Sequence, residues 1–163
     1  MKGLLLCALT LSVLVSGMAN PVMATQRPFY ATVQFDDEGA GVCRRIWVDE
    51  EGILHALGCL NTGVMSGDID GTIEAVAKLN LLSFGEDGPI DGKAQLRGDI
   101  TPEGESEASY LMTLHAVFEG GFISGKFAIH GIGSLEGVDA SGTVTGNPAD
   151  APVELIGTIT TRI

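Results

Sequence analysis

Apolar side chains recur at every second position along most of this chain, and glycines or acidic turns interrupt them about every eight to twelve residues. Alternation with period two places one set of side chains on each face of a β-strand. The segment from Ala108 to Phe118 shows it most clearly, because six residues of one parity are apolar or aromatic before Gly120 and Gly121 end the run. The pattern therefore predicts a series of short amphipathic strands.

Other segments extend the same pattern. They are Phe29–Phe35, Cys43–Val48, Ile53–Leu60, Val64–Ile69, Lys93–Ile100, Ile123–Ile129, Val138–Val144 and Val153–Ile159. The acidic stretch Asp49–Gly52 predicts a four-residue hairpin turn between the second and third of these. Thr101–Ser106, rich in Pro, Glu and Gly, is expected to be an exposed loop.

One segment, Thr72–Leu82, is compatible with two structures. Glu74 and Lys78 stand at the i,i+4 spacing that favours a helix, whereas Ile73, Ala75, Ala77, Leu79 and Leu81 alternate strictly. The five-step alternation favours a strand.

Strands that each bury one face can form two stacked sheets or one sheet closed on itself. Closure removes the exposed edges that invite aggregation, and glycines inside strands provide the bends that a barrel needs. We therefore expect an all-β fold, a single antiparallel β-barrel of about eight strands.

The N-terminus is typical of a secretory signal peptide. Lys2 precedes an apolar run from Gly3 to Val15, and two small-residue triplets are acceptable cleavage sites, Val22-Met23-Ala24, which is favoured, and Gly17-Met18-Ala19. The run is too short for a membrane span, which needs about 20 apolar residues. We expect residues 1–24 to be removed, and residues 25–163 to form one secreted or periplasmic barrel domain without a membrane span.

The chain is acidic, with 21 Asp and Glu against nine Lys and Arg and a formal net charge of −12. Nucleic acids and anionic membranes are bound through Lys and Arg, so neither is an expected partner. Solubility is the plainest interpretation of this charge. Cys43 and Cys59 are expected to form a disulfide, because export permits oxidation; two reduced, buried cysteines are the alternative.

The C-terminal part resembles a known family. The steps Gly131-Ile132-Gly133, Leu135-Glu136-Gly137 and Gly142-Thr143, together with Ser66–Ile73 upstream, are similar to the allene oxide cyclase-like and dirigent-like β-barrels. The resemblance covers about residues 64–162. It implies a lipocalin-like barrel whose interior can take an apolar small molecule, and it implies no activity, since fold and function separate freely.

Candidate binding residues lie on the face predicted to point into the barrel: Tyr110, Met112, Phe118 and Phe127, together with His55 between Ile53 and Leu57. An enzyme needs ionisable groups on that face. Almost all Asp, Glu, Lys and Arg share a face with polar residues instead, so no catalytic residue is assigned and an enzyme is disfavoured. The only tryptophan, Trp47, shares a face with Arg45 and Asp49.

No cofactor or metal is expected. The chain has no Gly-x-Ser-x-Gly, phosphate-loop or His-Glu-x-x-His motif. Asp68-Ile69-Asp70-Gly71 fails as an EF-hand loop, because position 12 would be Ala77 rather than Glu. His115 and His130 lie at unequal distances from the Gly120-Gly121 turn, which argues against direct opposition.

The pattern as a whole favours an exported β-barrel that binds an apolar or weakly polar small molecule without transforming it. Two alternatives remain open: an isomerase or cyclase acting on a hydrophobic substrate, and an extracytoplasmic surface or interaction protein with a filled core, since small barrels are often filled by side chains.

Overall fold

The computed structural model describes residues 23–36, 42–83, 90–104, 108–148 and 151–162. The predicted signal peptide lies almost entirely outside these ranges, as does the end of the predicted 101–106 loop. The described residues form nine strands: β1 (Ala24–Phe35), β2 (Arg45–Val48), β3 (Leu54–Gly67), β4 (Gly71–Ser83), β5 (Asp91–Thr101), β6 (Ser109–Glu119), β7 (Phe122–Ile132), β8 (Val138–Gly146) and β9 (Val153–Arg162). A 3₁₀ turn, η1 (Gly133–Leu135), is the only helical element described.

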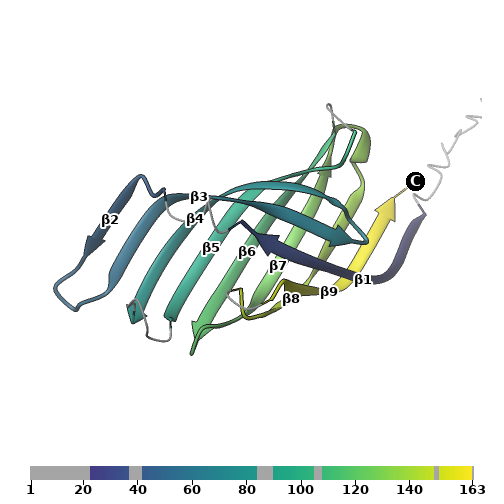
Figure 1. The fold of residues 1–163 in the computed structure, drawn as a ribbon. Coiled ribbons are helices and arrows are strands. Elements are labelled where there is room, and N and C mark those ends of the chain that lie inside the picture. Colours follow the sequence, from purple (N-terminus) through teal and green to yellow (C-terminus); the bar gives the residue numbers. More distant parts are fainter. Residues whose placement is uncertain (1–22, 37–41, 84–89, 105–107, 149–150, 163) are drawn as a thin grey trace, which may run out of the picture.

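All nine strands belong to one antiparallel sheet in the order β1-β9-β8-β7-β6-β5-β4-β3-β2. An additional pairing between β1 and β3 closes the sheet into a ring of eight strands and leaves β2 outside it. Figure 1 shows β1 and the end of β3 crossing in front of the strands β5 to β7. The predicted antiparallel barrel of about eight strands is confirmed.

The long strand β3 pairs with two different strands along the same edge. Its C-terminal part, Gly63–Gly67, pairs with β1 and closes the barrel, whereas Leu54–Leu57 pairs with β2. The sheet therefore continues past the closed ring. We call this extension the flare: it consists of β2, the first half of β3 and the adjoining ends of β4, β5 and β6 (Figure 1).

The sequence pattern predicted two strands, Ile53–Leu60 and Val64–Ile69, where the structure has the single strand β3. The expected break is absent, because Asn61, Thr62 and Gly63 pair with β4 and continue the strand. A β-bulge lies earlier, between Leu57 and Cys59. Gly58 takes a left-handed conformation with φ of 67°, so Ala56 and Cys59 both face the core although three positions separate them.

The ambiguous segment Thr72–Leu82 forms strand β4, as predicted. Ile73, Ala75 and Ala77 are buried, and β4 is hydrogen-bonded to β3 on one side and to β5 on the other. Pairing on both edges satisfies every backbone group that a helix would have satisfied internally. Tertiary pairing therefore overrides the helical i,i+4 pair of Glu74 and Lys78.

The interior of the ring is packed with apolar side chains contributed by the inward parity of each strand. Its largest fully buried members are Phe29, Met65, Ile100, Met112, Ile129 and Leu155. Phe29 and Phe127 meet across the barrel with ring centroids 5.4 Å apart. The described interior is thus an ordinary close-packed core, as in many eight-stranded barrels.

A second, smaller cluster lies in the flare and consists of Ala56, Cys59 and Ala77. The predicted disulfide between Cys43 and Cys59 is confirmed and covers this cluster. Backbone bonds from Leu60 N to Val42 O and from Arg44 N to Leu57 O extend the β2–β3 pairing past the bulge. The disulfide therefore anchors the strand that the ring itself does not hold.

Candidate functional site

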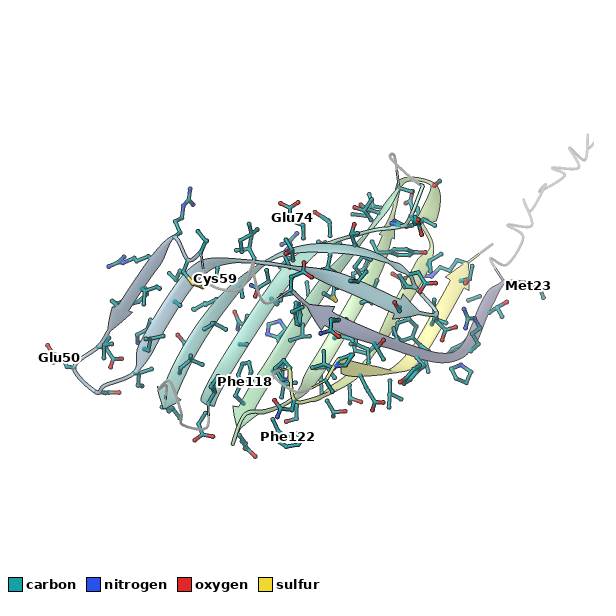
Figure 2. The ribbon with its side chains drawn as sticks, viewed as in Figure 1. Met23, Glu50, Cys59, Glu74, Phe118 and Phe122 are labelled. Atoms are coloured by element: carbon teal, nitrogen blue, oxygen red, sulfur yellow. A yellow bond between two sulfur atoms is a disulfide. The ribbon has the colours of Figure 1, made fainter. Side chains whose placement is uncertain are left out.

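The predicted binding residues do not meet in one place. Met112 and Phe127 are buried in the core, and Tyr110 is partly buried against it. None of these three lines a hollow described below. Phe118 is partly buried at the end of β6, beside the flare (Figure 2).

His55 was expected to face the barrel interior, and this orientation is wrong. The bulge at Gly58 shifts the parity of β3, so Ala56 rather than His55 faces inward. His55 pairs with Trp47 on β2 and with Asn80 on β4, both on the outer face of the sheet. The apolar Ile53 and Leu57 on either side of His55 made its face resemble a core face, but both line the outer hollow together with it.

The outer face of the flare contains a hollow of about 840 Å³. A single cross-strand row supplies much of its lining: Trp47, His55, Asn80, Lys93 and Val117. The volume lies within the roughly 300–1,000 Å³ typical of small-molecule sites. We call this site the flare hollow.

Apolar side chains dominate the walls of the flare hollow. They come from four strands and the β2–β3 turn: Trp47, Ile53, Leu57, Leu82 and Val117. Leu82 is 66% exposed and Val117 37% exposed, although both are apolar. Apolar side chains that remain accessible around a concavity are typical of a binding surface.

His55 is held from three sides. Its Nε2 lies 2.7 Å from Oδ2 of Asp49, and its Nδ1 lies 2.8 Å from Oδ1 of Asn80. The Trp47 ring stacks on the imidazole with centroids 4.8 Å apart and 17° between the planes. The guanidinium of Arg45 covers the Trp47 ring at 4.7 Å. This arrangement, the His55 clamp, fastens β2 to β3 and β4.

The clamp favours a charged pair. The hydrogen bond to Asp49 raises the pKa of His55, and the bond to Asn80 adds to this, whereas desolvation and the charge of Lys78 oppose it. The bond to His55 lowers the pKa of Asp49, with a further contribution from the N–H of Ile53. Both oxygens facing the imidazole are acceptors, so the protonated ring can donate to both.

This geometry limits the chemistry that His55 can perform. A general base needs a ring nitrogen with a free lone pair facing its substrate. Both nitrogens of His55 are engaged by Asp49 and Asn80 instead. His55 therefore positions the turn and the Trp47 ring, and it offers a bound molecule a flat surface rather than a proton acceptor.

Four charged groups surround the apolar walls. Lys78 comes from the middle of β4, whereas Lys93, Asp91 and Glu119 lie near the ends of β5 and β6. Asp91 accepts a hydrogen bond from the N–H of Gly120. Basic and acidic groups are therefore neighbours at the β5–β6 end of the hollow.

Within the described ranges, no group of three or more His, Cys, Asp or Glu side chains is placed to hold a metal ion. His115 opposes Lys126, and His130 opposes Leu111, so the two histidines are not paired across the ladder, as predicted. Nor does any described segment form a helix with the length and apolar character that a bilayer span requires. Comparison with protein-family models, curated proteins and solved structures gives no match.

The sequence did not single out Lys78, Lys93 or Asn80 as site residues, because alternation indicates only that they face outward. Their shared site depends on register: Lys93 opposes Asn80, and Asn80 opposes His55. A five-residue connection, closed by a bond from Asp49 N to Ile53 O, sets Trp47 opposite His55. The four-residue turn predicted from the sequence would have set Trp47 opposite Leu54.

Proposed function

We propose that this chain is an exported binding protein for an apolar or weakly polar small molecule, and that the flare hollow is its site. The observation that supports this most is the hollow itself, about 840 Å³ in volume and lined mainly by accessible apolar side chains. The disulfide and the apolar N-terminal run support export.

We place the site on the outer face of the flare rather than in the barrel interior, because side chains fill the interior. Met112 and Ile129 in the ring are fully buried and leave no accessible surface for a ligand. Leu57 and Val117 in the hollow are partly exposed and free to lose water on binding. In this proposal, an apolar ligand binds because it removes this apolar surface from water.

The polar residues around the hollow support a protein that binds its ligand without transforming it. The isomerase alternative needs a side chain that can move a proton, and His55 has both nitrogens engaged. Phe118 borders the hollow, and its side chain packs against the ring core.

The test uses Trp47, the only tryptophan, as an internal energy donor to the neutral apolar dye phenylnaphthylamine. We expect saturable binding with one site per chain. Leu57→Asp, which places a charge in the hollow, should abolish it. Val76→Asp is the matched control, because Val76 is 50% exposed on the same outer face and does not line the hollow.

Three outcomes would count against the proposal. Absence of saturable binding would refute it. Equal loss in both variants would show that the dye responds to the charge of the face rather than to the hollow. Loss with Tyr110→Ala but not with Leu57→Asp would return the site to the barrel interior.

A further inference from the structure

Basic side chains gather on one face of this acidic protein. Lys78, Lys93, Arg97 and Lys126 share the outward parity of β4, β5 and β7, and Arg45 lies on the same face of β2. The whole chain has only nine basic residues and a net charge of −12. Glu74, Asp91, Asp99 and Glu119 share this face, so the basic side chains lie between acidic ones that are nearer the strand ends.

Two of these bases lie inside the flare hollow and next to each other. Lys78 opposes Gln95 and Lys93 opposes Asn80, so the two lysines occupy diagonal positions on neighbouring strands. Diagonal neighbours on one face of a sheet have Cβ atoms about 7–8 Å apart or less. Two flexible four-carbon side chains at that separation can direct both ammonium groups at one acceptor.

Neither lysine forms an ion pair with another described residue. The ion pairs in the described ranges involve Arg27, His55, His130 and Arg162. On the facing strands of β4 and β5, the groups opposite the lysines are the neutral amides of Gln95 and Asn80. Within the part of the chain that the structure describes, two adjacent ammonium groups are thus available beside an apolar surface.

The His55 clamp adds no net charge beside the lysines, because protonated His55 is paired with ionised Asp49. His55 lies in the same row, and its pKa is raised by Asp49, while Lys78 acts on His55 in the opposite direction, as a nearby cation does. The acidic members of the hollow lie beside Lys93: Asp91 is two residues before it on the same face of β5, and Glu119 occupies a diagonal position on β6. Leu57, Trp47 and Val117 supply the apolar wall next to the lysines.

We propose that the flare hollow binds an organic anion with an apolar body, whose acidic group is held jointly by Lys78 and Lys93. The apolar body packs against Trp47, Leu57 and Val117. The acidic group accepts charge-assisted hydrogen bonds from the two ammonium groups, which are roughly twice as strong as neutral ones. This inference rests on the proposed function and adds the chemical class of the ligand.

The experiment compares decanoate with decan-1-ol, which share an alkyl chain and differ in charge. Binding is followed by Trp47 fluorescence in the wild type and in the Lys78→Gln/Lys93→Gln variant. We expect decanoate to bind more tightly than decanol, and the double substitution to lower decanoate affinity by at least about tenfold, the effect of losing a hydrogen bond to a charged group. Decanol affinity should not change.

The matched control is Arg97→Gln/Lys126→Gln. It removes the same charge from the same face, but both residues lie outside the flare hollow. We expect it to keep the preference for decanoate. Lys93→Gln alone provides a milder variant, and far-ultraviolet circular dichroism confirms that each variant is folded.

The outcomes separate the two proposals. Equal and lysine-independent binding of decanoate and decanol would overturn the anion inference and leave the proposed function standing. Equal loss of decanoate affinity in both double variants would also overturn it, because overall charge would then explain the effect. Binding of neither compound would overturn both proposals.

Discussion

At the scale of single residues, the His55 clamp shows how one side chain connects three strands. Asp49 and Asn80 engage the two ring nitrogens of His55, and Trp47 stacks on its ring. Asp49 also accepts bonds from the N–H groups of Glu51 and Ile53, so the same carboxylate shapes the turn. The clamp therefore links protonation to the position of β2.

The clamp predicts a defined pH window of stability. The folded pKa of His55 is raised, so its contribution is complete below its unfolded value near 6.5 and is lost as the pH rises through the folded pKa. The folded pKa of Asp49 is lowered, so its contribution is present above about 3.8 and is lost as the pH falls. The stabilisation should be largest from about pH 4 to 6.5.

We predict that His55→Gln lowers the free energy of unfolding most within that window and less at alkaline pH. Urea denaturation of the wild type and the variant across the pH range measures the difference. His115→Gln serves as control, because His115 is exposed on the same face and forms no ion pair among the described residues. A loss from His55→Gln that is constant with pH would contradict the prediction.

At the scale of the elements, the bulge at Gly58 decides which face of β3 carries the site. Before it, Leu54 and Ala56 face inward; after it, Cys59 and Met65 do. The left-handed φ of 67° is easily adopted only by glycine. A Cβ at this position would also lie 3.0 Å from Cβ of Arg44.

We predict that Gly58→Ala destabilises the protein by about 1–2 kcal/mol, the strain of a left-handed Cβ. Gly58→Asn should cost less, since Asn tolerates this conformation better. Chemical denaturation gives the free energies, and the emission of Trp47 reports whether the hollow rearranges. A Gly58→Ala variant as stable as the wild type would show that the bulge does not require glycine.

The disulfide makes a second prediction at this scale. It connects the segment preceding β2 to β3 across a sequence separation of 16 residues, and a loop of that length is worth about 3 kcal/mol in the chain-entropy model. We expect Cys43→Ser/Cys59→Ser to lower the unfolding free energy by about that amount. Loss of ligand binding in a variant that is still folded would show that the flare has loosened, whereas unchanged stability would refute the prediction.

At the scale of the whole molecule, the barrel is closed by the pairing of β1 with β3, which is the shortest strand pairing in the ring. β1 pairs with β3 through five residues, Ala31 to Phe35, and with β9 through ten. Close approach at the closure depends on glycine, because a Cβ on Gly63 would lie 2.3 Å from the carbonyl oxygen of Gln34. Asp68 reinforces it by accepting bonds from Arg27 and from the N–H of Tyr30.

We predict that the β1–β3 pairing opens before the other ladders. Hydrogen exchange followed by mass spectrometry should show faster exchange in 63–67 than in 153–162 of β9. Gly63→Ala should accelerate exchange first at this pairing, since the added Cβ pushes β1 away. Uniform acceleration throughout the barrel would show instead that closure and the rest of the sheet unfold as one unit.

Much of the fold could be predicted because it depends on local pattern. The alternating apolar residues of β6, such as Met112 and Leu114, are buried as expected, and the Gly120-Gly121 turn has the positive φ values that glycine permits. The prediction failed at His55, because the apolar Ile53 and Leu57 beside it line an exposed hollow rather than the core. Period-two alternation shows that such residues share a face, but it cannot distinguish an apolar binding surface from a core.

The sequence by itself determined the all-β class, the core face of most strands and the disulfide, since these follow from periodicity and from the pairing of two cysteines. Only the tertiary structure decided that β2 lies outside the ring and that Trp47, Lys78 and Lys93 meet around one hollow. Those features depend on cross-strand register, which is set by the exact length of a turn and the place of a bulge. Residues far apart in the chain become neighbours only when that register is established.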